Sequence, residues 1–199
     1  MISGLGPATV DGVPRAPRLR PANGIFHITS RGNRRQSIFF EDADREWFLY
    51  FLEHTVKRFD WTCHAYCLMD NHVHLLVETP KENLSEGMQW LLGRYALDFN
   101  WRHGLDGHLF QGRFKSQVVD SNWHLLELAR YIVLNPVRAG MCAAAADWPW
   151  SSYGASVGAT DAPTFLALDW LLSQFGRQPD AARATYAAFV SAGPIRASP

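Results

Sequence analysis

Alternation of apolar and polar residues predicts the first β-strands of the chain. Residues 25–31 are short, β-branched and aromatic, and they stop at Gly32-Asn33, a typical turn. Residues 61–68 and 72–78 flank the turn-forming stretch Met69-Asp70-Asn71. We therefore expect one strand followed, after an intervening segment, by a β-hairpin.

Apolar residues spaced three and four apart predict two long helices. The first covers residues 42–59, between the first strand and the hairpin. The second covers residues 84–102, after the hairpin, and a glycine-containing break follows it. Tyr95 lies on the apolar stripe of the second helix, so we expect it in the core.

A fourth strand and a third helix complete this pattern. Residues 114–120 read as a strand, and residues 123–134 carry the apolar stripe of a helix. Asn122 is the expected N-cap, and Pro136 should end the helix because proline disfavours helical geometry in the residue before it. The order strand, helix, strand, strand, helix, strand predicts an α+β fold with a ferredoxin-like antiparallel sheet packed with helices.

The two ends of the chain depart from the pattern. Residues 1–22 are rich in Pro, Gly and Arg without an apolar period, so we predict a disordered basic tail. Residues 23–155 then form the predicted main domain. Residues 156–199 contain two short helical patterns, 165–175 and 179–191, which predict a C-terminal helical extension.

Composition narrows the class of protein. With 199 residues and 47% hydrophobic content, the chain can bury one good core. It lacks an apolar run near the roughly 18 to 20 residues that span a bilayer and a signal-peptide pattern at its start, which predicts a cytoplasmic protein without a membrane partner. Three cysteines favour buried free thiols over disulfides. The net charge of zero gives no global signal for nucleic acid, although the first forty residues are rich in arginine.

Two histidines on the third strand form a candidate metal site. The period of two places His72 and His74 on one face and Val73 and Leu75 on the other, toward the core. Two imidazoles on the same side of a strand can converge on one cation, and sites completed by oxygen ligands accept magnesium or manganese. A pair of surface histidines at a sheet edge is the alternative explanation of this motif alone.

The third helix carries a polar face beside its apolar stripe. Glu127, Tyr131 and Asn135 are spaced four residues apart and so share one side of the helix. A polar face on a helix built for burial requires a polar partner. Alternatively, Tyr131 is a half-buried aromatic residue with a hydrated hydroxyl, and Asn135 is a C-terminal cap before Pro136.

Four ordered motifs distinguish between these alternatives. They are FHITSRGN at residues 26–33, MDNHVHLL at 69–76, HLFQGRFK at 108–115 and RYIVLNPVRAG at 130–140. Together, over roughly two-thirds of the chain, they resemble the REP-associated tyrosine transposases, which belong to the HUH class of single-strand nucleases and transposases.

This resemblance implies specific roles. His72 and His74 would bind Mg²⁺ or Mn²⁺, with the amide oxygen of Asn135 as third ligand, and Tyr131 would be the nucleophile. The fold would be of the HUH transposase type. The implied activity is cleavage and rejoining of single-stranded DNA next to hairpins through a 5′-phosphotyrosine intermediate. The implied partner is single-stranded DNA with hairpin structure, bound by a monomer or a homodimer.

Two further side chains have possible accessory roles. Glu127 could orient or deprotonate the hydroxyl of Tyr131, or it could be a solvated acid. His27 could point from the first strand toward the metal face, although a core histidine with satisfied hydrogen bonds is the stronger interpretation.

Cations that lie among aromatic residues are candidate DNA contacts, because aromatic rings stack on bases and cations bind phosphates. These candidates are Arg31, Arg34, Arg35, Arg113 and Lys115. For each one alone, a solvated cation beside a structural aromatic residue is an equal interpretation.

Two other functions use the same fold. One is a domesticated protein that binds DNA hairpins without cutting them. The other is a metal-dependent hydrolase that activates water. Replacement of Tyr131 by Phe separates these functions from strand transfer, since only strand transfer requires the hydroxyl.

Overall fold

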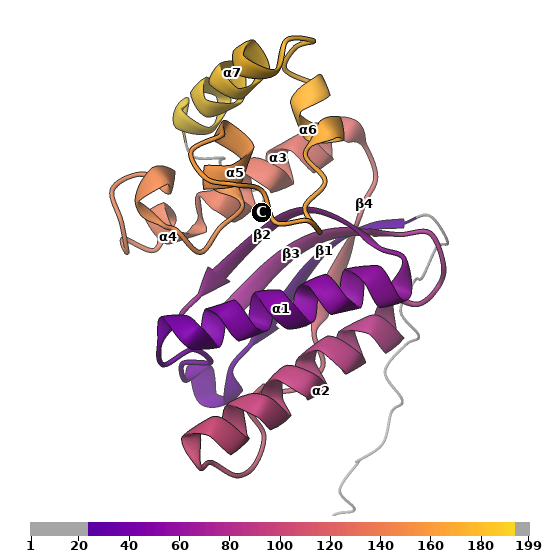
Figure 1. Ribbon diagram of the computed structural model, residues 1–199, viewed down its shortest axis with the longest axis vertical. Helices are drawn as coiled ribbons and strands as arrows, with labels where there is room; N and C mark the ends of the chain where they lie inside the picture. The colour runs from indigo at the N-terminus through magenta and orange to yellow at the C-terminus, as the bar shows by residue number, and fades with distance from the viewer. Residues whose placement is uncertain (1–23, 194–199) are drawn as a thin grey trace, which may run out of the picture.

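The computed structural model describes residues 24–193, in which a four-stranded sheet lies between two layers of helices (Figure 1). The predicted tail at residues 1–22 lies outside this range. None of the described helices is both long and apolar enough to cross a membrane.

The strands are β1 (Gly24–Arg31), β2 (Thr62–Met69), β3 (His72–Thr79) and β4 (Lys115–Val119). The helices are α1 (Asp42–Phe59), α2 (Leu84–His103), α3 (Asn122–Val133), α4 (Asn135–Arg138), α5 (Tyr153–Val157), α6 (Asp169–Ser173) and α7 (Pro179–Ser191), with 3-10 turns η1 (Asn33–Arg35) and η2 (Ala145–Asp147).

The strand order is β2-β3-β1-β4, and all neighbouring strands are antiparallel. Helix α1 connects β1 to β2, and α2 connects β3 to β4. This arrangement is the ferredoxin-like sheet expected from the order of elements, so the predicted α+β class is confirmed.

The two faces of the sheet pack against different helices (Figure 1). Helices α1 and α2 cover the face that carries Phe26, Val73 and Leu75. Helix α3 and the C-terminal helices cover part of the other face, where Leu76 packs with Ile132 of α3. Alternation along each strand thus supplies two separate cores. Tyr95 belongs to the first core and is 0% exposed, as predicted. Cys63 and Cys67 are buried free thiols, also as predicted.

The C-terminal segment covers the outer edge of β2. The backbone N–H of Leu68 donates to the carbonyl of Trp150 (2.8 Å), and that of Ala167 donates to the carbonyl of Cys63 (2.8 Å). Leu166 forms a parallel bridge with Cys63. The predicted helix at residues 165–175 is therefore wrong in its first part, because these residues pair with the sheet edge before α6 begins at Asp169.

The start of α3 also differs from prediction. Ser121, not Asn122, is the N-cap: its hydroxyl accepts a hydrogen bond from the backbone N–H of His124 (3.2 Å). Asn122 is instead the first helical residue. At the other end, α3 stops before Pro136 as expected. Pro136 lies in the first turn of α4, where its missing N–H needs no partner.

Candidate active site

The side chains of His72 and His74 extend from β3 toward the layer that contains α3. The alternating residues Val73 and Leu75 are 0% exposed and belong to the opposite core, which confirms the predicted division of the strand. His74 is 5% exposed, whereas His72 is half-buried. Two imidazoles therefore share one face of the sheet, with ring centroids 5.0 Å apart.

His27 of β1 lies beside His74 on the same face. Its Nε2 is 3.0 Å from Nδ1 of His74, and the two rings stack with centroids 5.2 Å apart. The hydroxyl of Thr29 lies 3.4 Å from the same nitrogen of His74. The sequence left two interpretations of His27, and the structure places it toward the candidate metal face. Its contact occupies Nδ1 of His74 and leaves Nε2 for another partner.

Asn71 determines where His72 carries its proton. The amide nitrogen of Asn71 donates to the carbonyl of Arg35 (3.0 Å), which orients the amide oxygen toward His72. That oxygen can only accept, so Nδ1 of His72 donates to it across 2.7 Å. The lone pair of Nε2 is consequently available to bind a cation.

The three imidazoles are held in the neutral form. Burial, with a smaller contribution from the charge of His124, lowers the pKa of His27 from 6.5 to about 4. Burial and the charge of Arg31 lower the pKa of His72 to about 4. The pKa of His74 lies well below 6.5, mainly because this side chain is buried. Repulsion from the positive charges that His27 and His72 would carry when protonated, and from Arg31, lowers it further. Neutral imidazoles are the form that binds metals.

Tyr131 of α3 stands edge-on to two of these rings. Its ring centroid is 5.8 Å from that of His74, with an interplanar angle of 89°, and 5.9 Å from that of His27. The side chain is half-buried. The phenol and the imidazoles, which are far apart in the sequence, thus lie on the same face of the sheet.

Asn135 lies one turn beyond Tyr131, in the first residue of α4. Its amide nitrogen donates to the carbonyl of Tyr131 (2.9 Å), as expected of a residue that caps the end of a helix. The cap uses the nitrogen of the amide. The predicted ligand atom is the oxygen, so capping and metal binding by Asn135 are compatible.

Glu127 is engaged by a different partner. Both of its carboxylate oxygens accept hydrogen bonds from Nη2 of Arg130, at 2.9 and 2.7 Å. The guanidinium of Arg130 lies 4.3 Å from the ring centroid of Phe189 on α7 and donates to its carbonyl. Glu127 is therefore neither a solvated acid nor a free base, but part of the contact between α3 and α7.

Two of the five predicted DNA contacts, Lys115 and Arg31, lie in the sheet beside His74 and His72. Lys115 pairs with Thr29, which in turn pairs with His74, so these residues form one row across three strands. Arg31 pairs with His72 in the next row. Lys115 is exposed and Arg31 half-buried. A positively charged strip therefore borders the imidazoles.

The other three cations lie elsewhere. Arg34 and Arg35 are exposed in η1, next to Asn71, and both have positive φ values of 52° and 62°. Arg113 lies in the loop before β4 and lines a groove under α2, together with Phe110. The cations that the sequence grouped by composition thus occupy three separate places.

Two candidate residues were missed. The guanidinium of Arg138 lies 5.0 Å from the ring centroid of Tyr131. Its position seven residues after Tyr131, two helical turns away, was an available signal. Nδ1 of His124 on α3 donates a hydrogen bond to the carboxylate of Asp120 (3.0 Å), and the charge of His124 contributes to the lowered pKa of His27. Its proximity to His27 depends on tertiary packing, which the sequence does not reveal.

A second group of potential metal ligands consists of Glu41, Asp44 and His103, whose ligand atoms lie within 4.8 Å of one another. The Asp44 carboxylate is 0% exposed and already accepts four hydrogen bonds. One oxygen accepts from the backbone N–H groups of Phe40 (2.6 Å) and Glu41 (3.1 Å); the other from Arg102 (2.7 Å) and His103 (2.8 Å). A guanidinium thus supplies the compensating cation, so these residues form a closed ionic network.

Comparisons with known proteins agree with this arrangement. Residues 22–135, more than half of the chain, match the family described as "Transposase IS200 like". A protein of Haemophilus influenzae named "Putative REP-associated tyrosine transposase" is 24% identical over 168 residues, which cover 79% of this chain and 90% of the relative.

A solved REP-associated tyrosine transposase, bound to a REP hairpin, shares the fold with a TM-score of 0.64. It is 19% identical, and the match covers 78% of this chain and 92% of that one. The expected resemblance to REP-associated tyrosine transposases is confirmed. The chain therefore belongs to the IS200-like transposase family, and so to the DNA-processing enzymes.

Proposed function

We propose that this protein cleaves and rejoins single-stranded DNA through a phosphotyrosine intermediate formed on Tyr131, in a reaction that requires a divalent metal. The observation that carries the proposal is the contact between the phenol ring of Tyr131 and the imidazole of His74, with centroids 5.8 Å apart. A tyrosine beside neutral imidazoles, on the polar side of a sheet, combines a nucleophile with ligands for a metal.

The side chains fit a divalent cation. Nε2 of His72 keeps its lone pair because Asn71 binds the other nitrogen, and His27 binds Nδ1 of His74 in the same manner. The amide oxygen of Asn135 would add the oxygen ligand that Mg²⁺ or Mn²⁺ prefers. When bound, such an ion would polarise a non-bridging phosphate oxygen and offset the negative charge that develops there.

The tyrosine performs the bond exchange. Its oxygen attacks the phosphorus, a new bond joins phosphorus to the phenol oxygen, and the bond to the 3′ oxygen breaks. The phenol loses its proton and the departing 3′ oxygen gains one, so the products are a 5′-phosphotyrosine and a free 3′-hydroxyl. One phosphodiester has replaced another, which allows a second 3′-hydroxyl to reverse the step and join a new strand without ATP.

Three cations around the site are suited to the phosphates of the strand. Arg138 lies over the ring of Tyr131, where negative charge gathers during attack. Lys115 and Arg31 lie in the same rows of the sheet as His74 and His72. Glu127 is assigned no part in proton transfer, because Arg130 binds both of its oxygens.

The proposed substrate is single-stranded DNA next to a hairpin. The similar transposase of known structure is bound to a REP hairpin, and we extend that partner to this chain on the basis of the shared fold. Hairpins formed by palindromes that flank the gene of this protein are the natural first substrates.

Replacement of Tyr131 by Phe tests the proposal. Wild-type protein incubated with labelled hairpin DNA and Mg²⁺ should form a complex that resists denaturation, and EDTA should prevent it. The Tyr131→Phe variant should form no such complex, whereas Tyr50→Phe, at an exposed tyrosine of α1, should behave as wild type.

The other outcomes identify the alternatives. Cleavage that survives Tyr131→Phe would indicate a hydrolase that uses water. Tight hairpin binding without any cleavage by the wild type, in Mg²⁺ or Mn²⁺, would indicate a domesticated binding protein. Either result would refute strand transfer through Tyr131.

A further inference from the structure

The guanidinium of Arg45 on α1 lies within a cage of aromatic rings. Its central carbon is 5.3 Å from the ring centroid of Phe39, 5.8 Å from that of Trp148 and 5.6 Å from that of Trp150. These distances are those of cation–π contacts. The Arg45 side chain is only 10% exposed, so three separate segments of the chain enclose one buried cation.

The carboxylate of Asp70 is the nearest ion-pair partner of Arg45. Nη2 of Arg45 donates to it across 2.6 Å, whereas the exposed carboxylate of Asp42 lies 3.3 Å from Nη1. Asp70 belongs to the turn between β2 and β3, two residues before His72. The helix α1, which covers one face of the sheet, is thus tied to the turn that leads into the histidine strand (Figure 1).

Stability is a weak reason for this ion pair. A buried cation loses its hydration, and pairing it with a carboxylate often adds no net stability compared with an apolar side chain. Nε of Arg45 is also buried without a hydrogen-bond partner among residues 24–193, so the lost hydration is replaced only in part. What the ion pair supplies is a fixed position for the Asp70 carboxylate and its turn.

Hydrogen bonds carry the position of this turn to His72. The carbonyl of Asp70 accepts from the N–H of Ile38 (2.8 Å), and the carbonyl of Asn71 accepts from the N–H of Gly32 (2.9 Å). The side-chain oxygen of Asn71 then accepts from Nδ1 of His72 (2.7 Å). Because this acceptor belongs to the turn, the geometry of the turn decides whether Nε2 of His72 keeps its lone pair.

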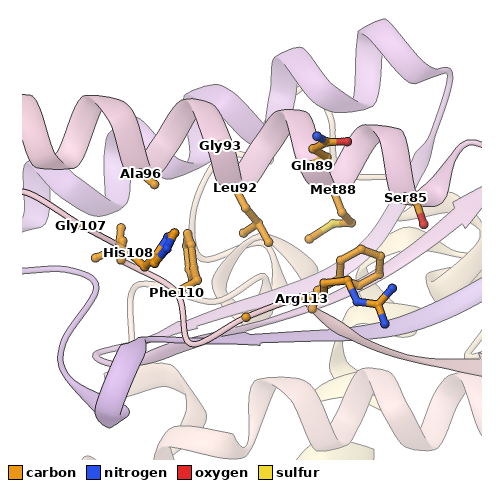
Figure 2. Close-up of a pocket in the computed structure, with 13 residues that line it drawn as sticks. Ser85, Met88, Gln89, Leu92, Gly93, Ala96, Gly107, His108, Phe110 and Arg113 are labelled. Atoms are coloured by element: carbon orange, nitrogen blue, oxygen red, sulfur yellow. The ribbon is translucent and has the colours of Figure 1, made fainter. Parts of the chain in front are cut away.

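The amide nitrogen of Asn71 is anchored from a different side. It donates to the carbonyl of Arg35 in η1 (3.0 Å). The N–H of Asn33, also in η1, donates to the carbonyl of Leu109 (2.8 Å), in a loop that faces α2 across a groove (Figure 2). The acceptor for the Asn71 amide is therefore held independently of Arg45, whose effect on the site passes through the turn itself.

We propose that Arg45 is a positioning residue for His72. It holds the carboxylate of Asp70, and with it the turn in which Asn71 keeps the proton of His72 on Nδ1. Nε2 of His72 then remains available to the metal. The inference rests on the proposed function, in which His72 binds that metal. It extends the site to a cation of α1, the helix on the opposite face of the sheet.

NMR of the metal-free protein tests where His72 carries its proton. Isotope-labelled histidine reports the tautomer of each neutral imidazole at neutral pH, and the signals of His72 are those that His72→Gln lacks. The wild type should carry the proton on Nδ1. Arg45→Met keeps an apolar side chain of similar length in the cage but removes the ion pair. Its His72 should shift toward the Nε2-protonated tautomer, which a free histidine side chain prefers in water.

Binding of Mn²⁺, measured by calorimetry, gives a second readout. Arg45→Met should weaken binding about tenfold, the lower end of the effect of losing a residue that orients a metal ligand. Asp70→Asn should weaken it by a similar factor. The double variant should bind no more weakly than the weaker single variant, because both residues act through the same turn.

Arg58→Met is the matched control. Arg58 lies in the last turn of α1, and its guanidinium packs over Phe59 and Trp90, at 5.7 and 5.8 Å from their ring centroids. This arginine resembles Arg45 in helix and in aromatic contacts, but it lies at the other end of α1 from the turn. Arg58→Met should change neither the tautomer of His72 nor the affinity for Mn²⁺.

Urea denaturation separates positioning from general stability. The midpoint of Arg45→Met should lie at or above that of the wild type, because an apolar side chain replaces a buried cation and the half-exposed Asp70 is hydrated. Asp70→Asn alters only a half-exposed side chain, so it provides the same two readouts if Arg45→Met does not fold.

The proposal is overturned if folded Arg45→Met or Asp70→Asn keeps both the Nδ1 proton of His72 and the wild-type affinity for Mn²⁺. An equal tautomer shift in Arg58→Met would also overturn it. Either result leaves the proposed function intact if the wild type forms its covalent complex on Tyr131. A tautomer shift in Arg45→Met alone, with no covalent complex in the wild type, would support the positioning role and refute the proposed function.

Discussion

The polar cluster around Asp44 and the polar cluster around His74 both contain histidines, and they differ in how completely their hydrogen bonds are satisfied. Around Asp44, both carboxylate oxygens accept two hydrogen bonds each, and Arg102 supplies a compensating charge. Around His74, neighbouring side chains bind one nitrogen of an imidazole and leave the other. A saturated cluster holds α1 and α2 together. A cluster with lone pairs to spare can bind a ligand.

The two tyrosines that face the sheet repeat this contrast. Tyr95 is 0% exposed, its hydroxyl donates to the carbonyl of Ile38, and burial raises its pKa. Tyr131 is half-buried and meets His27 and His74 edge-on. Residue type alone does not identify a nucleophile, since both tyrosines lie on amphipathic helices. The surroundings of each side chain distinguish Tyr131, which lies beside imidazoles, from Tyr95, which lies in the core.

The largest expected effect is on the histidine cluster. His74→Ala should reduce formation of the covalent DNA complex at least about 100-fold, because loss of even an indirect support of a metal costs 10- to 100-fold. Its unfolding midpoint in urea should fall, because truncation of this buried ring leaves a cavity, but the variant should still be folded in the absence of urea. A folded variant that forms the covalent complex as well as the wild type would make His74 a structural residue and erase the contrast with Asp44.

Asp44→Asn should mainly lower stability, whereas His74→Ala should mainly lower formation of the covalent complex. Removing this buried charge takes the carboxylate partner from His103 and one of two from Arg102, which keeps Asp98, and it should lower the free energy of unfolding by about 3 kcal/mol. Urea denaturation measures this change. Mg²⁺ should not stabilise the wild type through this cluster, so the difference between the two proteins should be the same in Mg²⁺ and in EDTA. A difference that grows with Mg²⁺ would show that Asp44 binds metal.

Acid should weaken the histidine cluster. The pKa of His27 is about 4 in the folded protein and 6.5 in an unperturbed chain, so the unfolded state binds more protons between these values. Its contribution to stability is present above pH 6.5 and is lost as the pH falls toward 4. In EDTA, urea midpoints measured from pH 7 to 5 should fall less for His27→Gln than for the wild type. His54→Gln, at an exposed position, should follow the wild type. Identical pH profiles for the wild type, His27→Gln and His54→Gln would show that His27 does not contribute to the pH dependence of stability.

The smallest effect concerns the helix that carries Tyr131. Ser121→Ala removes the N-cap of α3 and should cost about 1 kcal/mol in the free energy of unfolding. Asn122→Ala, at the first helical residue, should change it by less than half as much. A larger loss for Asn122→Ala than for Ser121→Ala would favour Asn122 as the cap, as the sequence alone predicted.

Much of the fold is predictable from local patterns. The bounds of α1 and α7 agree with the apolar period and its end signals, and the alternation in β3 separates His72 and His74 from Val73. These signals are local, because each depends on residues within one element. The wrong helix start at residue 165 has the opposite cause: Leu166 pairs with Cys63, a contact made only when the chain is folded.

The candidate site was predictable only in part for the same reason. The motifs identified His72, His74, Tyr131 and Asn135, but not the contact between His27 and His74, which depends on how β1 pairs with β3. The ion pair of Glu127 with Arg130 was readable from their spacing of three residues on one helix, whereas the contact of Arg130 with Phe189 depends on the packing of α7. Sequence spacing indicates which residues share a face. Which of them remain available depends on neighbours from distant segments.

The stacking of Arg130 on Phe189 has a practical meaning for anyone who shortens this protein. The last helix supports the back of the helix that presents the tyrosine, while the sheet draws its main core from elsewhere. A truncation that removes Phe189 would thus leave a recognisable domain in which Tyr131, the proposed nucleophile, is misaligned. Trimmed versions made for crystallisation should be judged by turnover, not by solubility.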